Sequence, residues 1–452
     1  MKTKKLLSSA LSLVLAAALL TGCAGGGASG SSAAPSGGAS QTAGSSQSGN
    51  SAKPYAGTTI NFIYPGAVWA DTVKANIDEF KQETGITVNM QQFTNDQLAQ
   101  KIAVTEAAGG KDIDVLCYAP LQNKLLYVKN GWADPLDDYI AKSADFDVKD
   151  YQTPAINSVT TNGKIYGIPW ITEREVVSYN KAMFQAKGVS IPTTFDELMA
   201  AAAKLTDSSK GIVGIAMRGK GAAAVTQFSG FLYGYGGDFI KDGKATINTP
   251  EAVKAFQYYG DIVRKYGPKG AINMDWQDTQ SLFSQGRAAM RVDADSQYAF
   301  SIDPKSSIVS KNVGVFQFPA GPSGSKPYSV SAWCLGISSG STHKDAAWEF
   351  IKWACGKDMD VKEMAAGNPS ARQSTWKNET ATKAFPSELV KVIDTTMPVA
   401  VGYDRPAMIN VGDARTQIGN VIIGAIEGQS VQPLADKANA AVQALLDKEK
   451  AK

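Results

Sequence analysis

Short apolar strands alternate with amphipathic helices in the first part of this chain, and this alternation limits the fold more than any other feature. Residues 59–64 alternate apolar and polar side chains as a strand does, and residues 70–84 place apolar side chains at helical spacing. A second strand (86–90), a second helix (96–108) and a buried strand (112–118) follow. This order predicts an α/β fold with helices on both faces of a sheet.

Helical patterns continue through the rest of the chain. Thr194 precedes an apolar run and is followed three residues later by Glu197, which is the pattern of a capping box at a helix start. Apolar residues at helical spacing also predict helices near residues 250–266, 344–355, 413–427 and 431–448.

The length and charge of the chain limit its organisation and its partners. With 452 residues it is longer than one hydrophobic core usually supports, so we expect two or three domains. It carries 45 lysine and arginine residues against 42 aspartate and glutamate residues, a net charge of +3. This balance gives no clustered basic face, so we do not expect nucleic acid as a partner.

The N-terminus has the pattern of an export signal. Lys2, Lys4 and Lys5 precede an apolar run over residues 6–20, which is too short for a membrane-spanning helix and fits a signal peptide over residues 1–22. The run ends in Leu-Thr-Gly before Cys23, which resembles the lipobox of bacterial lipoproteins. The resemblance implies that Cys23 is lipidated and anchors the mature protein to the outside of the cell membrane.

A flexible tether is expected between this cysteine and the folded body. Residues 24–53 consist almost wholly of Gly, Ser, Ala, Gln and Thr and contain no aromatic residue, so they cannot form a core. We therefore assign residues 23–57 to the lipidated cysteine and its tether, and expect the folded body to begin at residue 58.

The remaining cysteines are Cys117, Cys334 and Cys355. An odd number cannot all pair, so a disulfide framework is not expected, and three small buried thiols are the favoured interpretation. A single bridge between Cys334 and Cys355 stays open.

The sequence contains little that indicates catalysis. His343 is the only histidine, and there is neither a zinc-type Cys/His spacing nor a nucleotide-binding motif. Two carboxylate pairs, Glu173 with Glu175 and Asp293 with Asp295, leave a surface glycoside hydrolase as a less favoured alternative. Residues two apart on a strand point the same way, which fits poorly with two carboxyls facing each other across a bond.

Motifs from the middle to the end of the chain lie in the order seen in one family. The segments are residues 166–169, 179–184, 191–198, 283–290, 318–324, 332–338, 347–351, 367–372 and 428–430. Together they resemble the family 1 extracellular solute-binding proteins of the maltose-binding type, which serve ABC sugar transporters.

The resemblance implies a two-lobed periplasmic-binding-protein fold of type II, with an interlobe cleft and hinge strands. It assigns residues 58–168 and 294–332 to an N-terminal lobe, and residues 169–293 and 333–452 to a C-terminal lobe. It implies a monomer that closes around a small solute, a sugar or oligosaccharide, and delivers it to a membrane-embedded ABC permease. It implies no reaction, so we expect no catalytic residue, no metal and no other cofactor.

Candidate ligand-binding residues follow from the chemistry of a polyol. Its hydroxyls need fixed and preferably charged hydrogen-bond partners, and its C–H faces need flat aromatic surfaces. Among the loops that the family turns toward its ligand, this sequence offers a set of aromatic and charged residues. They are Tyr64, Trp69, Tyr118, Trp170, Glu173, Trp276, Asp293, Asp295, Trp333 and Arg372, with Gln122 close to Tyr118.

The chain departs from the maltose type at two places. Ser331 and Ala332 precede Trp333 where sugar binders often carry two glycines, and Arg415 lies near the position of a stacking aromatic residue. Together with Arg405 and the carboxylates, these differences leave open a charged solute: an acidic sugar, a phosphorylated polyol or a polyamine.

Overall fold

The computed structural model describes residues 53–451 apart from residue 67. The predicted signal peptide, Cys23 and the tether up to residue 52 lie outside the described residues. Within the described part of the chain, no helix is long and apolar enough to cross a membrane. Cys117, Cys334 and Cys355 are buried free thiols, so the Cys334–Cys355 bridge that the sequence left open is not formed.

One mixed sheet runs through the described body, in the order β2-β1-β3-β12-β6-β10-β7, with β11 also paired to β6. Strands β1, β2 and β3 are parallel, as the strand–helix alternation predicts, and β12 is antiparallel to both β3 and β6. The strands are β1 (Thr59–Pro65), β2 (Thr87–Phe93), β3 (Val115–Tyr118), β6 (Ile168–Asn180), β7 (Val213–Ala216), β10 (Ala288–Ala294), β11 (Val313–Gln317) and β12 (Ser329–Ile337). Two small hairpins, β4 (Thr160–Thr161) with β5 (Lys164–Ile165) and β8 (Ile240–Lys241) with β9 (Lys244–Ala245), lie apart from this sheet.

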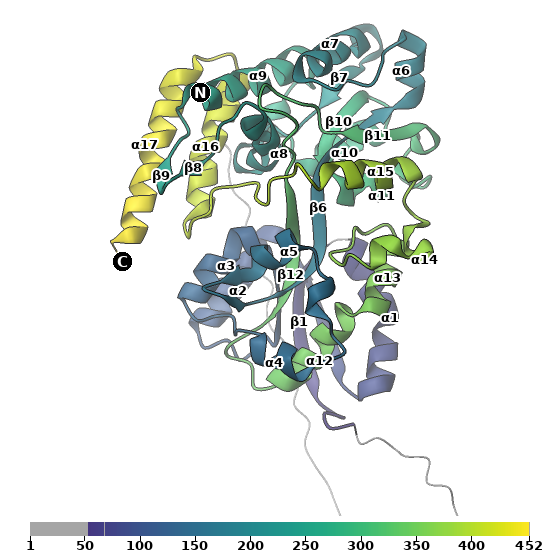
Figure 1. Cartoon of the computed structure of the whole chain (residues 1–452), viewed down its shortest axis with the longest axis vertical. Helices are drawn as coiled ribbons and strands as arrows, with labels where there is room; N and C mark the ends of the chain where they lie inside the picture. The colour runs from purple at the N-terminus through teal and green to yellow at the C-terminus, as the bar shows by residue number, and fades with distance from the viewer. Residues whose placement is uncertain (1–52, 67, 452) are drawn as a thin grey trace, which may run out of the picture. The chain divides into compact units, whose positions relative to one another are not determined.

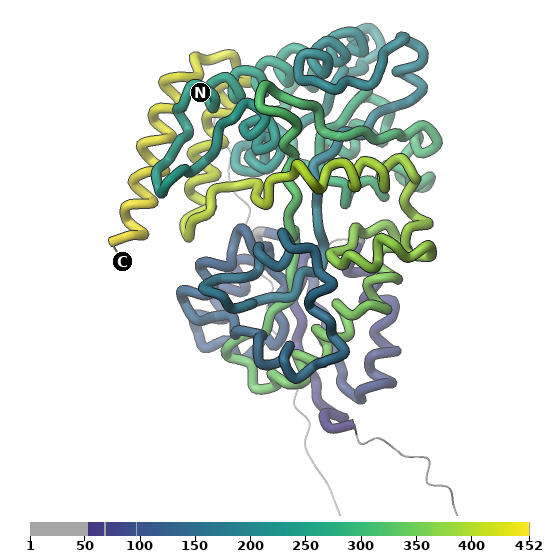
Figure 2. Tube along the Cα trace, viewed as in Figure 1, coloured from purple at the N-terminus to yellow at the C-terminus, as the bar shows by residue number. Residues whose placement is uncertain are grey.

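Strand β6 belongs to two lobes at once. Its first half pairs with β12 as far as Arg174, and its second half pairs with β10 from Glu175 onward and with β11. Figure 1 shows β6 and β12 running between the two lobes. The trace in Figure 2 passes from one lobe to the other along β6, returns along β12 and crosses again after α13.

The N-terminal lobe is built around aromatic residues of strands and helices that are far apart in the sequence. Phe62 of β1 lies with its ring centroid 5.1 Å from that of Phe350 of α12, and Phe80 of α1 lies 5.2 Å from Trp353. The helices of this lobe are α1 (Val68–Thr84), α2 (Asn95–Ala107), α3 (Pro120–Lys129), α4 (Asp137–Lys142), α5 (Thr153–Val159), α12 (Lys344–Ala354) and α13 (Lys357–Ala365).

The C-terminal lobe has a larger helical core, in which Phe228 of α8 stacks on Phe256 of α9 at a centroid distance of 4.1 Å. Thr194 and Glu197 form the predicted capping box at the start of α7. The helices of this lobe are α6 (Lys181–Lys187), α7 (Phe195–Leu205), α8 (Gly221–Gly234), α9 (Pro250–Tyr266), α10 (Trp276–Ser284), α11 (Tyr298–Ile302), α14 (Glu379–Thr382), α15 (Ser387–Thr396), α16 (Val411–Ile426) and α17 (Val431–Lys450).

The division of the chain between the lobes differs from the expected one at two segments. The expected division places α12 in the C-terminal lobe with residues 333–452, but Trp348 and Phe350 lie in the core of the N-terminal lobe. It places residues 294–332 in the N-terminal lobe, but Val315 and Phe318 lie in the cores of the C-terminal lobe. The reason is that β12 is itself the returning strand, so the chain changes lobes along residues 329–337.

Candidate functional site

Glu173 lies where β6 leaves the N-terminal lobe. Every residue of β6 is buried except Glu173, which is partly exposed. Ser296, in the turn after β10, donates a hydrogen bond from Oγ to Glu173 Oε1 at 2.7 Å. Burial raises the pKa of Glu173 to about 7, and nearby Asp293 and Asp295 add to the rise against the opposing effects of Ser296 and Arg218. The strand therefore presents a single carboxyl group, one that gains or loses its proton near neutral pH.

Asp293 of β10 is the centre of a second charged group. Its carboxylate accepts from Arg218 Nη2 at 2.6 Å, from Arg291 Nη2 at 2.7 Å and from Gln227 Nε2 at 2.9 Å. Burial alone would raise the pKa of Asp293, but the two arginines hold it below its usual value. Asp293 thus stays ionised and fixes Arg218, which keeps part of its own surface exposed.

Asp295 makes a buried ion pair rather than an open contact. Its Oδ2 lies 3.0 Å from Arg174 Nη1, and both side chains are fully buried. Arg174 also donates from Nη2 to Gln152 Oε1 at 3.0 Å, and Gln152 directly precedes α5 of the N-terminal lobe. This pair, together with Gln152, connects the lobes at the residue of β6 that follows Glu173.

Two further arginines of the C-terminal lobe meet a side chain of the N-terminal lobe. Gln122 Oε1 of α3 accepts from Nη1 of Arg405 at 3.1 Å and from Nη1 of Arg415 at 3.0 Å. Both arginines also donate from Nη2 to Thr226 Oγ1 of α8, at 3.4 and 3.3 Å. Burial lowers the pKa of Arg415 to about 9, and the adjacent Arg405 lowers it further while Asp404 acts in the opposite direction.

Three tryptophans of the N-terminal lobe lie together at this boundary. The ring of Trp69 is 4.6 Å from Trp170 and 5.9 Å from Trp333, measured between centroids. Trp170 is buried and donates from Nε1 to Glu363 Oε1 at 2.6 Å. The register of β12 shifts on both sides of Trp333, and its side chain stays partly exposed. Trp333 is therefore the ring of this group with the most open face.

Several predicted site residues are occupied by contacts within the protein. Tyr64 is buried and stacks on Phe62 at 5.1 Å, and Tyr118 is buried and donates its hydroxyl to Tyr166 O at 2.8 Å. Arg372 is fully buried, and each of its five N–H donors meets a protein acceptor, which leaves none for a ligand. These side chains hold the N-terminal lobe together.

Trp276 is the first residue of α10 and remains partly exposed. A capping box formed by Asp275 and Asp278 starts this helix, and the Trp276 ring lies 5.9 Å from that of Phe300. Its carbonyl accepts from Arg291 Nη2 at 3.4 Å, which places its backbone next to the Asp293 group. The structure thus keeps Trp276 near the charged residues but not with the three clustered tryptophans.

The carboxylates of the two pairs noted in the sequence have different surroundings. Glu175 is fully buried, neither of its carboxylate oxygens has a hydrogen-bond partner among the described residues, and burial raises its pKa well above the usual value. Asp293 and Asp295 are each held by arginine. Among the described residues, no group of histidine, cysteine, aspartate and glutamate could hold a metal ion.

Sequence reasoning missed Arg218, Ser296 and Thr226. Arg218 lies two residues after the end of β7, and the neighbouring glycines are the one local sign of a loop beside a sheet. Ser296 follows the noted Asp293 and Asp295 directly, so its position was within reach of the same argument. Thr226 lies inside α8, where nothing in the sequence separates it from an ordinary helix residue.

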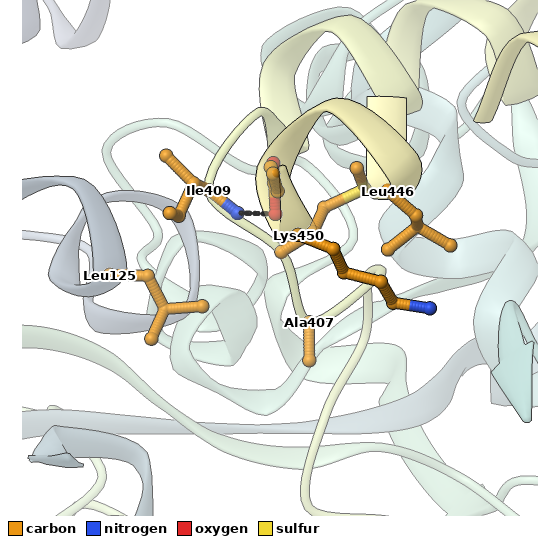
Figure 3. A pocket seen from close by; sticks show the side chains of 7 residues that line it. Leu125, Ala407, Ile409, Leu446 and Lys450 are labelled. Atoms are coloured by element: carbon orange, nitrogen blue, oxygen red, sulfur yellow. Dashed lines mark hydrogen bonds between the residues drawn. The ribbon is translucent and has the colours of Figure 1, made fainter. Parts of the chain in front are cut away.

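A pocket of about 340 Å³ lies between α3, the residues before α16 and the end of α17. Figure 3 shows Leu125 of α3 facing Ala407, Ile409, Leu446 and Lys450 across it. Glu449 of α17 accepts backbone hydrogen bonds from Ile409 and Asn410, at 3.0 and 2.6 Å. The lining of the pocket is mostly apolar, so the pocket differs in chemistry from the polar side chains around Glu173.

Comparison with known proteins gives consistent matches. Residues 66–360 match the model of a family described as bacterial extracellular solute-binding protein. The chain is 29% identical over 333 residues to the erythritol/L-threitol-binding protein of Mycolicibacterium smegmatis, covering 69% of each chain. It is 27% identical over 365 residues to the mannitol-binding protein of Pseudomonas aeruginosa, covering 76% of this chain and 82% of that one.

A solved structure shows the same fold. The ABC transporter solute-binding protein from Agrobacterium radiobacter in complex with ribitol superposes with a TM-score of 0.80 at 27% identity. The match covers 87% of this chain and 100% of the other. The predicted fold class, an α/β fold of two lobes of the solute-binding type, is confirmed by this match and by the sheet described above.

Proposed function

Because the chain belongs to the bacterial extracellular solute-binding protein family, we propose that it captures a small sugar or polyol for an ABC importer. The observation that carries this proposal is the meeting of partly exposed polar and aromatic side chains where the lobes join. Glu173 and Arg218 lie there with Trp333, and Gln122 of one lobe contacts two arginines of the other. The named solutes of the relatives, erythritol, threitol, mannitol and ribitol, support a polyol.

The chemistry of these side chains suits a polyhydroxylated solute. Charged groups make stronger hydrogen bonds to hydroxyls than neutral ones do, and their own partners hold them in place: Ser296 holds Glu173, and Asp293 holds Arg218. A partly exposed tryptophan offers an apolar face to the C–H groups of the solute. Of the predicted contacts, Glu173, Trp333, Trp69 and Trp276 keep this role in our proposal.

The binding motion in this proposal is a rotation of the lobes about β6 and β12. Solute-binding folds close by hinge motion, and hinges are a few residues that absorb the backbone change. Both strands pass between the lobes here, and β6 changes its pairing partner from β12 to β10 near Arg174. The hydrogen bonds from Arg405 and Arg415 to Gln122 would form and break in this rotation, since they join opposite lobes.

The cellular arrangement is also part of the proposal. Cys23 after an export signal supports a lipid anchor, and the Gly/Ser-rich residues that follow support a tether to the membrane surface. We propose that a monomer works there with a membrane-embedded permease. The extracellular family supports a place outside the cytoplasm.

A thermal-shift screen of the purified protein tests the proposed function. The panel contains erythritol, ribitol, mannitol, maltose, sugar acids, a sugar phosphate and a polyamine. A solute at about 100 times its Kd stabilises the folded protein by about 2.7 kcal/mol, which moves the melting temperature by a few degrees. A shift with polyhydroxylated solutes, which are then recovered intact, supports capture. Shifts with the polyamine alone, or cleavage of the solute, would contradict it.

A further inference from the structure

Arg405 and Arg415 donate to the same two neutral oxygens at the lobe boundary. Their Nη1 atoms lie 3.1 and 3.0 Å from Gln122 Oε1, and their Nη2 atoms lie 3.4 and 3.3 Å from Thr226 Oγ1. Two guanidinium groups held side by side repel each other, and the protein interior screens this repulsion less than water does. An anion placed against both groups would offset it.

Among the described residues, a carboxylate lies within ion-pair distance of only one of the two arginines. Asp404 pairs with Arg405, with Oδ2 and Nη2 2.5 Å apart. For Arg415, no carboxylate of the described residues lies within ion-pair distance, and its buried Nε has no hydrogen-bond partner there. The hydrogen bonds of the partly exposed Arg415 therefore go to neutral groups, and Asp404 acts on its charge only from beyond ion-pair distance.

The other carboxylates at the boundary are engaged elsewhere. Asp293 is shared between Arg218 and Arg291, so these two arginines also face one negative charge. Asp295 forms a buried ion pair with Arg174. Glu173 and Glu175 have no arginine at ion-pair distance among the described residues. Glu173 is bonded to Ser296 and is partly protonated near neutral pH, and burial raises the pKa of Glu175 well above its usual value. The boundary as a whole therefore carries an excess of positive charge.

We infer that the captured solute is a sugar acid with one carboxylate, and that this carboxylate binds against Arg405 and Arg415. The inference rests on the proposed function, because it names the chemical class of the solute for the same site. A carboxylate presents two oxygens in one plane, which matches the planar fork of a guanidinium. Its single negative charge would serve as the counterion for Arg415, which has no carboxylate at ion-pair distance among the described residues.

Other solutes fit the charges less well. A neutral polyol would leave Arg415 unneutralised after closure has excluded water, and an unpaired buried charge is costly. A phosphate monoester brings a charge of about −1.5 to −2, which exceeds the deficit. This chain would therefore differ from the relatives named above in the charge of its solute, while sharing with them the need to bind a row of hydroxyls.

Calorimetric titration of the full protein with matched solutes tests the inference. Ribitol and ribonate differ only in that a terminal alcohol is replaced by a carboxylate, and mannitol and mannonate form a second such pair. We expect the acid of at least one pair to bind about tenfold more tightly than its alcohol, a difference of about 1.4 kcal/mol.

The outcomes separate this inference from the proposed function. Equal or tighter binding of the alcohols overturns the sugar acid and leaves solute capture intact. Tighter binding of ribitol phosphate than of ribonate overturns the carboxylate. Absence of binding for every polyol, sugar and sugar acid overturns the proposed function and this inference with it.

The variant Arg415→Gln tests the residue. It keeps hydrogen-bonding capacity and removes the charge, so we expect affinity for the acid to fall about tenfold and affinity for the matching alcohol to change less than about threefold. Arg264→Gln, an exposed arginine of α9 paired with Asp261, is the matched control. Arg415→Lys, which keeps the charge, should retain part of the preference for the acid. Unchanged binding of the acid by a folded Arg415→Gln protein would overturn the assignment.

Discussion

Arg174 and Asp295 form a fully buried ion pair, with Nη1 and Oδ2 3.0 Å apart, at the point where β6 changes its pairing partner. The backbone N–H of Arg174 also donates to Asp295 Oδ1 at 2.9 Å, and its Nη2 reaches Gln152 of the N-terminal lobe. A guanidinium on the shared strand is thus held by groups from both sides of the lobe boundary.

This relationship predicts a large loss of stability when one partner is removed. Asp295→Asn leaves the Arg174 charge buried without its counterion, and we expect a loss of about 3 kcal/mol in the free energy of unfolding. Urea denaturation measures it, with Asp261→Asn on the exposed face of α9 as the control. A loss below about 1 kcal/mol would show that water or other groups solvate Arg174.

Glu173→Gln tests the single partly exposed residue of β6. The variant keeps the shape of the side chain and loses the charge-assisted hydrogen bonds to solute hydroxyls, so we expect solute affinity to fall about tenfold. Stability should not decrease, because the raised pKa shows that burial already disfavours the charged form. Titration calorimetry measures the affinity, and Glu79→Gln at an exposed ion pair is the control. Affinity within about twofold of the wild type would remove Glu173 from the site.

Trp333→Ala tests the aromatic face at the boundary. The variant removes the partly exposed ring next to Trp69, and we expect solute affinity to fall about tenfold. Trp353→Ala removes a partly exposed ring that packs on Phe80 of α1, and it should lower stability without changing affinity. Equal effects of the two substitutions on affinity would point to general damage to the lobe rather than to contact with the solute.

The raised pKa of Glu106 predicts that the stability of the folded protein depends on pH. It is 6% exposed, Ser338 donates to its Oε1 at 2.6 Å, and burial raises its pKa from 4.5 to about 7, with Asp134 adding to the rise. Between pH 4.5 and about pH 7 the folded protein therefore keeps the Glu106 carboxyl protonated, whereas the unfolded chain releases that proton. Its contribution to stability is therefore fully present below pH 4.5 and is lost as pH rises to about 7.

Glu106→Gln removes this titration and keeps an acceptor for Ser338. We expect the free energy of unfolding of the variant, relative to the wild type, to increase by about 2–3 kcal/mol between about pH 5 and about pH 8. Urea denaturation at the two pH values measures the difference, and Glu83→Gln on the exposed face of α1 is the control. A difference that does not change with pH would mean that Glu106 is ionised throughout.

Cys23→Ser tests the proposed anchor. Without the acyl chains the tethered body has nothing to hold it in the bilayer, so we expect the variant to leave the membrane fraction for the soluble extracytoplasmic fraction. Fractionation followed by immunoblotting measures the distribution. A variant that remains with the membrane would contradict lipidation at this residue.

The sequence predicted the local features of this fold well. The strand–helix alternation and the Thr194–Glu197 capping box depend on neighbours in the chain, and the structure confirms both. The residues that belong to each lobe were harder to predict. Helix α12 packs into the core of the N-terminal lobe through the contact of Phe350 with Phe62, and these residues are far apart in the sequence.

The sequence indicates only part of the proposed site, for a related reason. Glu173 and Trp333 carry a polar or aromatic side chain next to a strand motif, so the sequence indicates them. Arg372 looks similar in the sequence but is fully buried, which depends on acceptors from distant segments. Arg218 gave no sign of its role, because its partner Asp293 lies 75 residues further along the chain.

The sharing of β6 between the lobes has a consequence for the order of events in capture. A rotation about the shared strands displaces atoms in proportion to their distance from the axis. Glu173 belongs to the shared strand, so the proposed rotation would move it little, whereas Gln122 and the arginines opposite it belong to different lobes and would move relative to each other. A solute would therefore meet Glu173 in the same geometry before and after closure. The guanidinium groups would contact the solute last, so the final step of closure would depend on whether the solute carries a group that they can bind.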